Sequence, residues 1–155
     1  MLILFFVGAA LLIAIDQLTK YLVVKNISGI STVPLIKDVF HLTYWENRGA
    51  AFGILQDKRV FFIVITVLVV FFVVLFLVKQ KPKNVLLNLA LTLLIGGAVG
   101  NFTDRALRGY VVDFLDFRLI NFPIFNAADC FVVVGAALLV YYLIFMEGKD
   151  SYVNK

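Results

Sequence analysis

The sequence predicts an all-α membrane protein with four transmembrane helices, a small extracytoplasmic β-sheet and a short amphipathic segment. Of its 155 residues, 63% are hydrophobic, and the mean hydropathy is +1.01, well above the range of soluble domains. Four apolar runs approach the length needed to cross a bilayer. A separate stretch rich in β-branched and aromatic residues partly alternates, which favours strand.

The whole chain, residues 1–155, is expected to form a single integral membrane domain. We place the spans at about residues 2–24, 60–78, 85–104 and 126–146, with outer loops at 25–59 and 105–125. The apolar runs Val85–Val99 and Phe131–Met146 would each be only about 22–24 Å long at 1.5 Å per residue. Extending the first to Asp104 and beginning the second at Asn126 brings both to about 30 Å, the thickness of the hydrocarbon core.

Four crossings put both termini on one face of the membrane and both long loops on the other. Lys79, Lys81 and Lys83 crowd the short loop between the second and third spans, which indicates a cytoplasmic loop. The 25–59 loop also carries cations, but its length and its intervening acids weaken their influence. We therefore expect cytoplasmic termini and an extracytoplasmic face that holds the polar loop residues.

The outer loops contain two strand-like segments. In residues 33–47, Phe40, Leu42 and Tyr44 would share one face of a strand, and His41 would point away from it to the surface. A tight turn at Arg48-Gly49 and a half-buried segment, Ala50–Leu55, are expected to follow.

The second strand-like segment, Val111–Phe117, also alternates. Alternation puts Asp113 and Asp116 on opposite faces of the strand and leaves open which of them faces a buried site. Pro123 is expected to turn the chain before the fourth span.

Ionisable side chains at the edge of hydrocarbon are costly, so they mark candidate functional sites. Asp16 lies about 12 Å below the outer end of the first span and, four residues from Lys20, either forms a structural ion pair or supports a site. Asp104 and Arg105 leave the same choice open. Asn126 and Asp129 have the spacing of a helix N-cap, where the helix dipole favours an ionised carboxylate.

Composition narrows the chemistry. The single cysteine excludes an internal disulfide and a thiolate metal cluster, and the single histidine is a poor candidate for a metal site because there is no second imidazole. No Ser/His pair is apparent in the sequence. The positively charged residues are scattered along the chain, as is typical of side chains that contact anionic lipid head groups and not of a nucleic-acid-binding surface. Two carboxylates that share a site keep one proton between them, and such a pair can hydrolyse an amide by acid–base catalysis. A turn at Pro123 would bring Asp113 and Asp129 together.

Five motifs, in order along nearly the whole chain, resemble the bacterial prolipoprotein signal peptidase (signal peptidase II) family. They are Asp16-Gln17, Asn47-x-Gly-Ala-Ala-Phe52, Gly100-Asn-x-x-Asp-Arg105, Val111-Val-Asp-Phe114 and Phe125-Asn-x-Ala-Asp129. The resemblance implies an intramembrane aspartic endopeptidase with Asp113 and Asp129 as its catalytic dyad. It implies a surrounding polar shell made of Asp16, Asn47, Gly49, Asn101, Asp104, Arg105 and Asn126.

The resemblance further implies removal of the signal peptide just before the lipid-modified cysteine of diacylglyceryl-modified prolipoproteins. It implies no cofactor and no metal, and a β-cradle on the outer surface of the bacterial cytoplasmic membrane. Membrane lipids are the other expected partners, and a monomer is expected. Within the dyad, we expect Asp129 to act as the base and Asp113 to hold the proton.

Two other functions are compatible with the residues alone. A small proton-coupled four-helix transporter would use Asp16 as its proton carrier, although transporters tend to have shorter loops with a carboxylate near the midplane. A non-catalytic assembly subunit would tolerate Asp→Asn changes at both dyad positions.

Overall fold

The computed structural model describes residues 1–49 and 55–146. Within these ranges the elements are α1 (Leu2–Ile27), β1 (Thr32–Ile36), β2 (Phe40–Asn47), α2 (Arg59–Gln80), α3 (Val85–Arg108), β3 (Val111–Phe117), the short 3-10 helix η2 (Arg118–Ile120) and α4 (Ala127–Phe145). The four α-helices are each long and apolar enough to cross a membrane, so the protein is a multi-pass membrane protein. Residues 50–54 of the predicted amphipathic segment lie outside the described residues.

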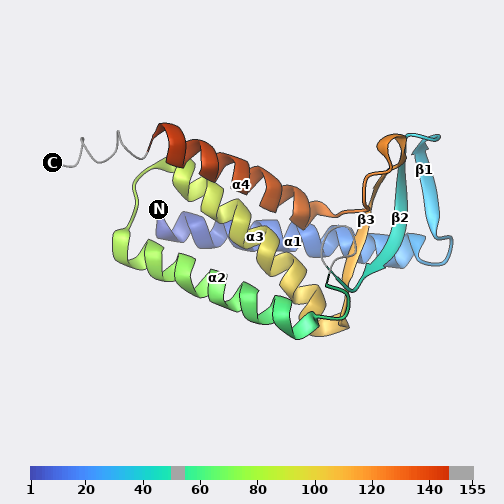
Figure 1. The fold of residues 1–155 in the computed structure, drawn as a ribbon, viewed down its shortest axis with the longest axis horizontal. Coiled ribbons are helices and arrows are strands. Elements are labelled where there is room, and N and C mark those ends of the chain that lie inside the picture. Colours follow the sequence, from blue (N-terminus) through green and yellow to red (C-terminus); the bar gives the residue numbers. More distant parts are fainter. Residues whose placement is uncertain (50–54, 147–155) are drawn as a thin grey trace.

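Helix α3 occupies the middle of the bundle (Figure 1). Half of its most apolar window is buried inside the protein, compared with 6% for α2, so α2 lies at the periphery. The bundle core includes Phe5, Leu91, Ile95 and Tyr142 from α1, α3 and α4. Large apolar side chains cover the outside of the helices, as expected of a surface that faces lipid. The start of α1 and the end of α4 lie at the end of the bundle away from the sheet.

Helices α1 and α3 extend beyond the predicted spans at the sheet end, to Ile27 and Arg108. Helix α3 continues to Arg108 and ends at Gly109, whose φ of 85° is the left-handed conformation that glycine adopts readily. Asn101, Asp104 and Arg105 therefore lie in its last two turns. These turns are held by the rest of the bundle, so the polar residues sit on a rigid element.

The three strands form one antiparallel sheet in the order β1-β2-β3. Leu42 and Tyr44 pack with a cluster that contains Val23 and Ile27 at the C-terminal end of α1, so the predicted apolar face is confirmed for these two side chains. The prediction for His41 is wrong, because its side chain is 7% exposed. His41 lies on the central strand, opposite Asp116 of β3 and with its Nδ1 3.5 Å from Thr32 Oγ1 of β1, so side chains of both neighbouring strands flank its ring.

The connection from β3 to α4 reverses earlier than Pro123. Helix η2 and Asn121, whose φ is 49°, make the turn. The returning chain is then fixed to β3, because the backbone N–H groups of Phe114 and Leu115 both donate to the carbonyl of Phe125, at 2.9 and 2.8 Å. This pairing places Asn126, the N-cap of α4, beside Asp113.

Candidate active site

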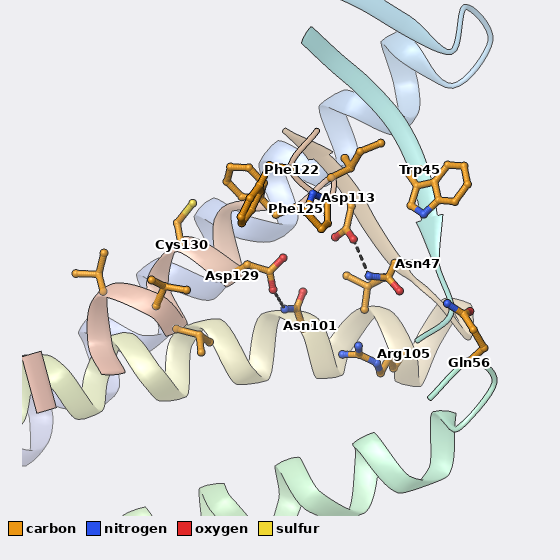
Figure 2. A pocket seen from close by; sticks show the side chains of 16 residues that line it. Trp45, Asn47, Gln56, Asn101, Arg105, Asp113, Phe122, Phe125, Asp129 and Cys130 are labelled. Carbon is orange, nitrogen blue, oxygen red and sulfur yellow. Dashed lines mark hydrogen bonds between the residues drawn. The ribbon is translucent and has the colours of Figure 1, made fainter. Parts of the chain in front are cut away.

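A cavity of about 830 Å³ opens where α3 and α4 meet strands β2 and β3, with a size typical of a ligand-binding pocket. Polar side chains gather at one end, and Phe122, Phe125 and the α4 residues Val132–Val134 line the apolar remainder. Figure 2 shows Asp113 and Asp129 projecting into the same space from β3 and α4. The polar lining consists of Asn47, Gln56, Asn101, Arg105, Asp113 and Asp129.

Asp113 is 1% exposed and its two oxygens accept separate hydrogen bonds. The Asn126 amide donates to Oδ1 at 2.6 Å, and the Asn47 amide donates to Oδ2 at 2.8 Å. Burial, followed by the negative charge of nearby Asp129, raises the pKa of Asp113 to about 7, although both carboxamide bonds act in the opposite direction. Asp113 therefore carries a proton for much of the time at neutral pH.

Asp129 occupies the first turn of α4 in a capping box. The Asn126 side chain accepts from the Asp129 backbone N–H at 3.0 Å, and Asp129 Oδ2 accepts from the Asn126 N–H at 3.1 Å. This confirms the cap predicted from the spacing. Asp129 Oδ1 accepts from the Asn101 amide at 2.8 Å. Two donors, the Asn126 backbone and the Asn101 amide, thus fix the position of the Asp129 carboxyl group.

Asn126 connects the two carboxylates. Its Nδ2 donates to Asp113 and also to Asn101 Oδ1 at 3.1 Å, and its Oδ1 accepts from the Asp129 backbone N–H. Every polar atom of this fully buried side chain is therefore in use. A single rigid carboxamide fixes where Asp113 and Asp129 lie relative to each other.

Asn47 and Arg105 line the pocket, and the backbone of Gly49 connects them. Asn47 Oδ1 accepts from the Gly49 backbone N–H at 2.9 Å, which leaves its Nδ2 for Asp113. Arg105 donates to the Gly49 carbonyl at 2.9 Å and stacks on Phe62, with its guanidinium 4.5 Å from the ring centroid. The end of β2 is thus fastened to α2 and α3.

Asp16 and Asp104 do not line the cavity but lie behind it. Both are fully buried, and both form ion pairs with the fully buried Lys20, at 2.8 and 3.0 Å. Gln17 donates to both carboxylates, at 3.1 and 3.3 Å. Sequence reasoning did not include Lys20 or Gln17 among the site residues, although a lysine within an apolar span was a usable signal.

Asp116 points to the other side of the sheet. Burial would raise its pKa, but hydrogen bonds from Thr43 and Arg118 outweigh this and hold the pKa below its usual value. The two donor distances are 2.6 and 2.8 Å. The structure thereby answers what alternation left open, because only Asp113 of the two faces the cavity.

The arrangement places two carboxyl groups within one partly apolar cavity, and the pKa of one of them, Asp113, is raised to about 7. Such a pair can activate water and protonate a carbonyl oxygen. Among the described residues, no group of three or more His, Cys, Asp or Glu side chains is placed to hold a metal ion. The carboxylate oxygens instead accept from carboxamides and from the backbone.

Comparisons with known proteins agree with one another. The model of the family described as signal peptidase (SPase) II, peptidase family A8, matches residues 8–145. The lipoprotein signal peptidase of Brevibacillus brevis is 52% identical over 147 residues, covering 95% of this chain and 98% of that protein. That of Caldanaerobacter subterraneus is 53% identical over 140 residues, covering 90% and 94%. A bacterial membrane enzyme structure obtained by the in meso method at 2.3 Å resolution superposes with a TM-score of 0.84 at 35% identity, covering 97% of this chain and 91% of that one.

Proposed function

Because this chain belongs to the signal peptidase II family of aspartic peptidases, we propose that it removes the signal peptide from diacylglyceryl-modified prolipoproteins, cleaving before the lipid-modified cysteine. The observation that carries the reaction type is the pair of carboxyl groups in one cavity, held by hydrogen-bonded carboxamides, with the pKa of Asp113 raised to about 7. Catalysis of this type needs no metal and no covalent intermediate.

The two carboxyl groups take different roles in this proposal. Asp129, ionised at the start of α4, removes a proton from the attacking water. Asp113, which holds a proton, donates it to the oxygen of the scissile carbonyl as the tetrahedral intermediate forms. When the amide bond breaks, Asp129 gives its proton to the leaving nitrogen, and Asp113 takes a proton back from the hydroxyl group of the tetrahedral intermediate. Asn101 and Asn126 keep both carboxyl groups in place throughout.

The shape of the cavity supports a lipid-anchored substrate. Its polar end lies at the last turns of α3 and the first turn of α4, which are the ends of two helices long and apolar enough to cross a membrane. Its apolar wall, with Phe122, Phe125 and Val132–Val134, extends along α4 toward the hydrocarbon. A peptide whose cysteine carries acyl chains would present its scissile bond at this depth while the chains remain among apolar side chains.

We place the protein in the bacterial cytoplasmic membrane with both termini in the cytoplasm. The support is the lysine-rich connection between α2 and α3, at the end of the bundle away from the sheet (Figure 1). The cavity and the sheet then face outward, where the sheet serves as a β-cradle for the substrate. We further propose that the protein acts as a monomer.

The proton-coupled transporter finds little support in the geometry. Asp16 is fully buried, pairs with Lys20 and accepts the Ala128 backbone N–H at 3.1 Å. A proton carrier must change its protonation state in contact with a water-filled path. The Asp16 carboxylate accepts from three donors behind the pocket, which fits a structural role better than proton transport.

The test is cleavage of a purified diacylglyceryl-modified precursor, followed by gel shift. Wild type should cut, and Asp113→Asn and Asp129→Asn should each lose activity by at least about 10³-fold, because neither amide can replace the acid or the base. Asp116→Asn is the matched control on the same strand and should cut at nearly the wild-type rate. Cleavage that survives in either dyad variant would show that the roles are assigned to the wrong residues.

A further inference from the structure

We propose that Lys20 is a positioning residue for the reaction, acting on the catalytic pair through Asn101. This inference rests on the proposed function. Lys20 lies in the C-terminal half of the apolar helix α1, is fully buried and does not line the cavity. Its Nζ lies within hydrogen-bond distance of three acceptors: Asp16 Oδ2 at 2.8 Å, Asn101 Oδ1 at 2.9 Å and Asp104 Oδ2 at 3.0 Å. An ammonium group has three N–H donors, so the geometry uses all of them.

Each acceptor holds a different part of the active site. Asp16 Oδ1 accepts from the Ala128 N–H, the backbone group next to Asp129. Asp104 Oδ2 accepts from the Val112 N–H at 3.1 Å, the backbone group next to Asp113. One buried cation therefore joins the start of α4, strand β3 and the end of α3.

The contact with Asn101 has a further consequence. An ammonium group cannot accept a hydrogen bond, so Lys20 requires the oxygen of the Asn101 carboxamide to face it. The amide nitrogen then faces away and donates to Asp129 Oδ1 at 2.8 Å. The Asn126 amide donates to the same oxygen at 3.1 Å, so Lys20, at 2.9 Å, is the shorter and the only charged of the two donors that hold it. Without Lys20 the carboxamide would be held by the Asn126 amide alone and would rotate more easily, which would bring its oxygen toward the carboxylate of Asp129, where the two acceptors repel. Lys20 thus stabilises the orientation in which the amide nitrogen of Asn101 meets the proposed base.

Helices α1 and α3 approach each other closely beside Lys20, where Gly100 faces Asp16. A Cβ added at Gly100 would lie 2.6 Å from Asp16 Oδ2, so only glycine lets the carboxylate reach its place beside Lys20. Gln17 adds a hydrogen bond to the Gly100 carbonyl at 3.1 Å. These contacts between α1 and α3 keep the ammonium group of Lys20 within hydrogen-bond distance of Asn101.

The decisive experiment is a double-mutant cycle on kcat, using the full-length protein and a diacylglyceryl-modified precursor. Lys20→Met should lower kcat about 10- to 100-fold, the cost of displacing a reacting group by about 1 Å, with KM unchanged within about twofold. Asn101→Ala should lower kcat similarly. If Lys20 acts through Asn101, the double variant is no slower than the slower single variant. Lys25→Met, at the exposed end of the same helix, is the matched control and should leave kcat unchanged.

Multiplicative losses in the double variant, or a loss confined to KM, would overturn the inference. Removing the lysine leaves two buried carboxylates without a counter-ion, which can prevent folding. If Lys20→Met does not fold, the triple variant Asp16→Asn, Lys20→Met, Asp104→Asn takes its place in the cycle, so that no buried charge of this cluster remains unpaired. The loss of kcat that it causes should be smaller when Asn101 is already alanine, and an equal loss in both backgrounds would overturn the inference. Absence of cleavage by the wild type would instead refute the proposed function, so the two failures are distinguishable.

Discussion

Raising the pH above neutrality should switch the peptidase off, because Asp113 must hold a proton to act as the acid. Its pKa of about 7 lies far above the ordinary 3.8. About half of the Asp113 carboxyl groups are therefore deprotonated at pH 7, and the protonated, active fraction falls about tenfold for each further pH unit. On the alkaline side, kcat/KM should fall with a slope of about one decade per unit. The dyad is coupled, so this limb reports the pair as a whole.

Removing Asn47 tests the structural origin of this limb. Its amide donates to Asp113 Oδ2 at 2.8 Å and stabilises the ionised form, which lowers the pKa. A hydrogen bond to a charged group is worth about 1.5–3 kcal/mol, equivalent to about 1–2 pKa units. In Asn47→Ala the pKa of Asp113 should rise, and the alkaline limb should move to higher pH by up to that amount.

The assay is the initial rate of precursor cleavage between about pH 5 and pH 9.5, with kcat/KM plotted against pH to report the free enzyme. Asn26→Ala, which changes an exposed asparagine at the end of α1, is the control and should keep the wild-type profile. A limb that stays in place or moves to lower pH in Asn47→Ala would refute the reasoning, because the donor would then not stabilise ionised Asp113. A lower maximal rate with an unshifted limb would have the same meaning.

The remaining predictions concern stability and metal dependence. Gly97→Ala should lower the free energy of unfolding by about 1–3 kcal/mol, because its Cβ would press on the Ala128 carbonyl between α3 and α4; Gly29→Ala, with nothing within 4 Å, should leave the detergent-solubilised Tm unchanged. Arg118→Gln should cost at most about 1 kcal/mol, because the ion pair to Asp116 is 41% exposed on the arginine side, and cleavage should continue. A chelator should leave the cleavage rate unchanged, and loss of activity restored by a divalent cation would refute a metal-free mechanism.

The amino-acid sequence by itself determined the features that depend on near neighbours in the chain. Apolar runs and their lengths located four helices, and the ends of the third and fourth had to include Asp104 and Asn126 to span the bilayer. The spacing from Asn126 to Asp129 predicted a capping box that is present. Alternation predicted the packed face of Leu42 and Tyr44. Each of these rests on helix or strand periodicity, which is a local property of the backbone.

Only the tertiary structure decided which side chains meet across the chain. Alternation separated Asp113 from Asp116, but the pairing of Phe125 with β3 selected Asp113 by bringing Asn126 beside it. Periodicity likewise failed for His41, because it does not tell which strand lies at the centre of a sheet. For Lys20 the sequence indicated one partner four residues away, whereas the fold adds two more from α3. Hydrogen bonds between distant elements depend on packing of whole helices, and no local pattern encodes them.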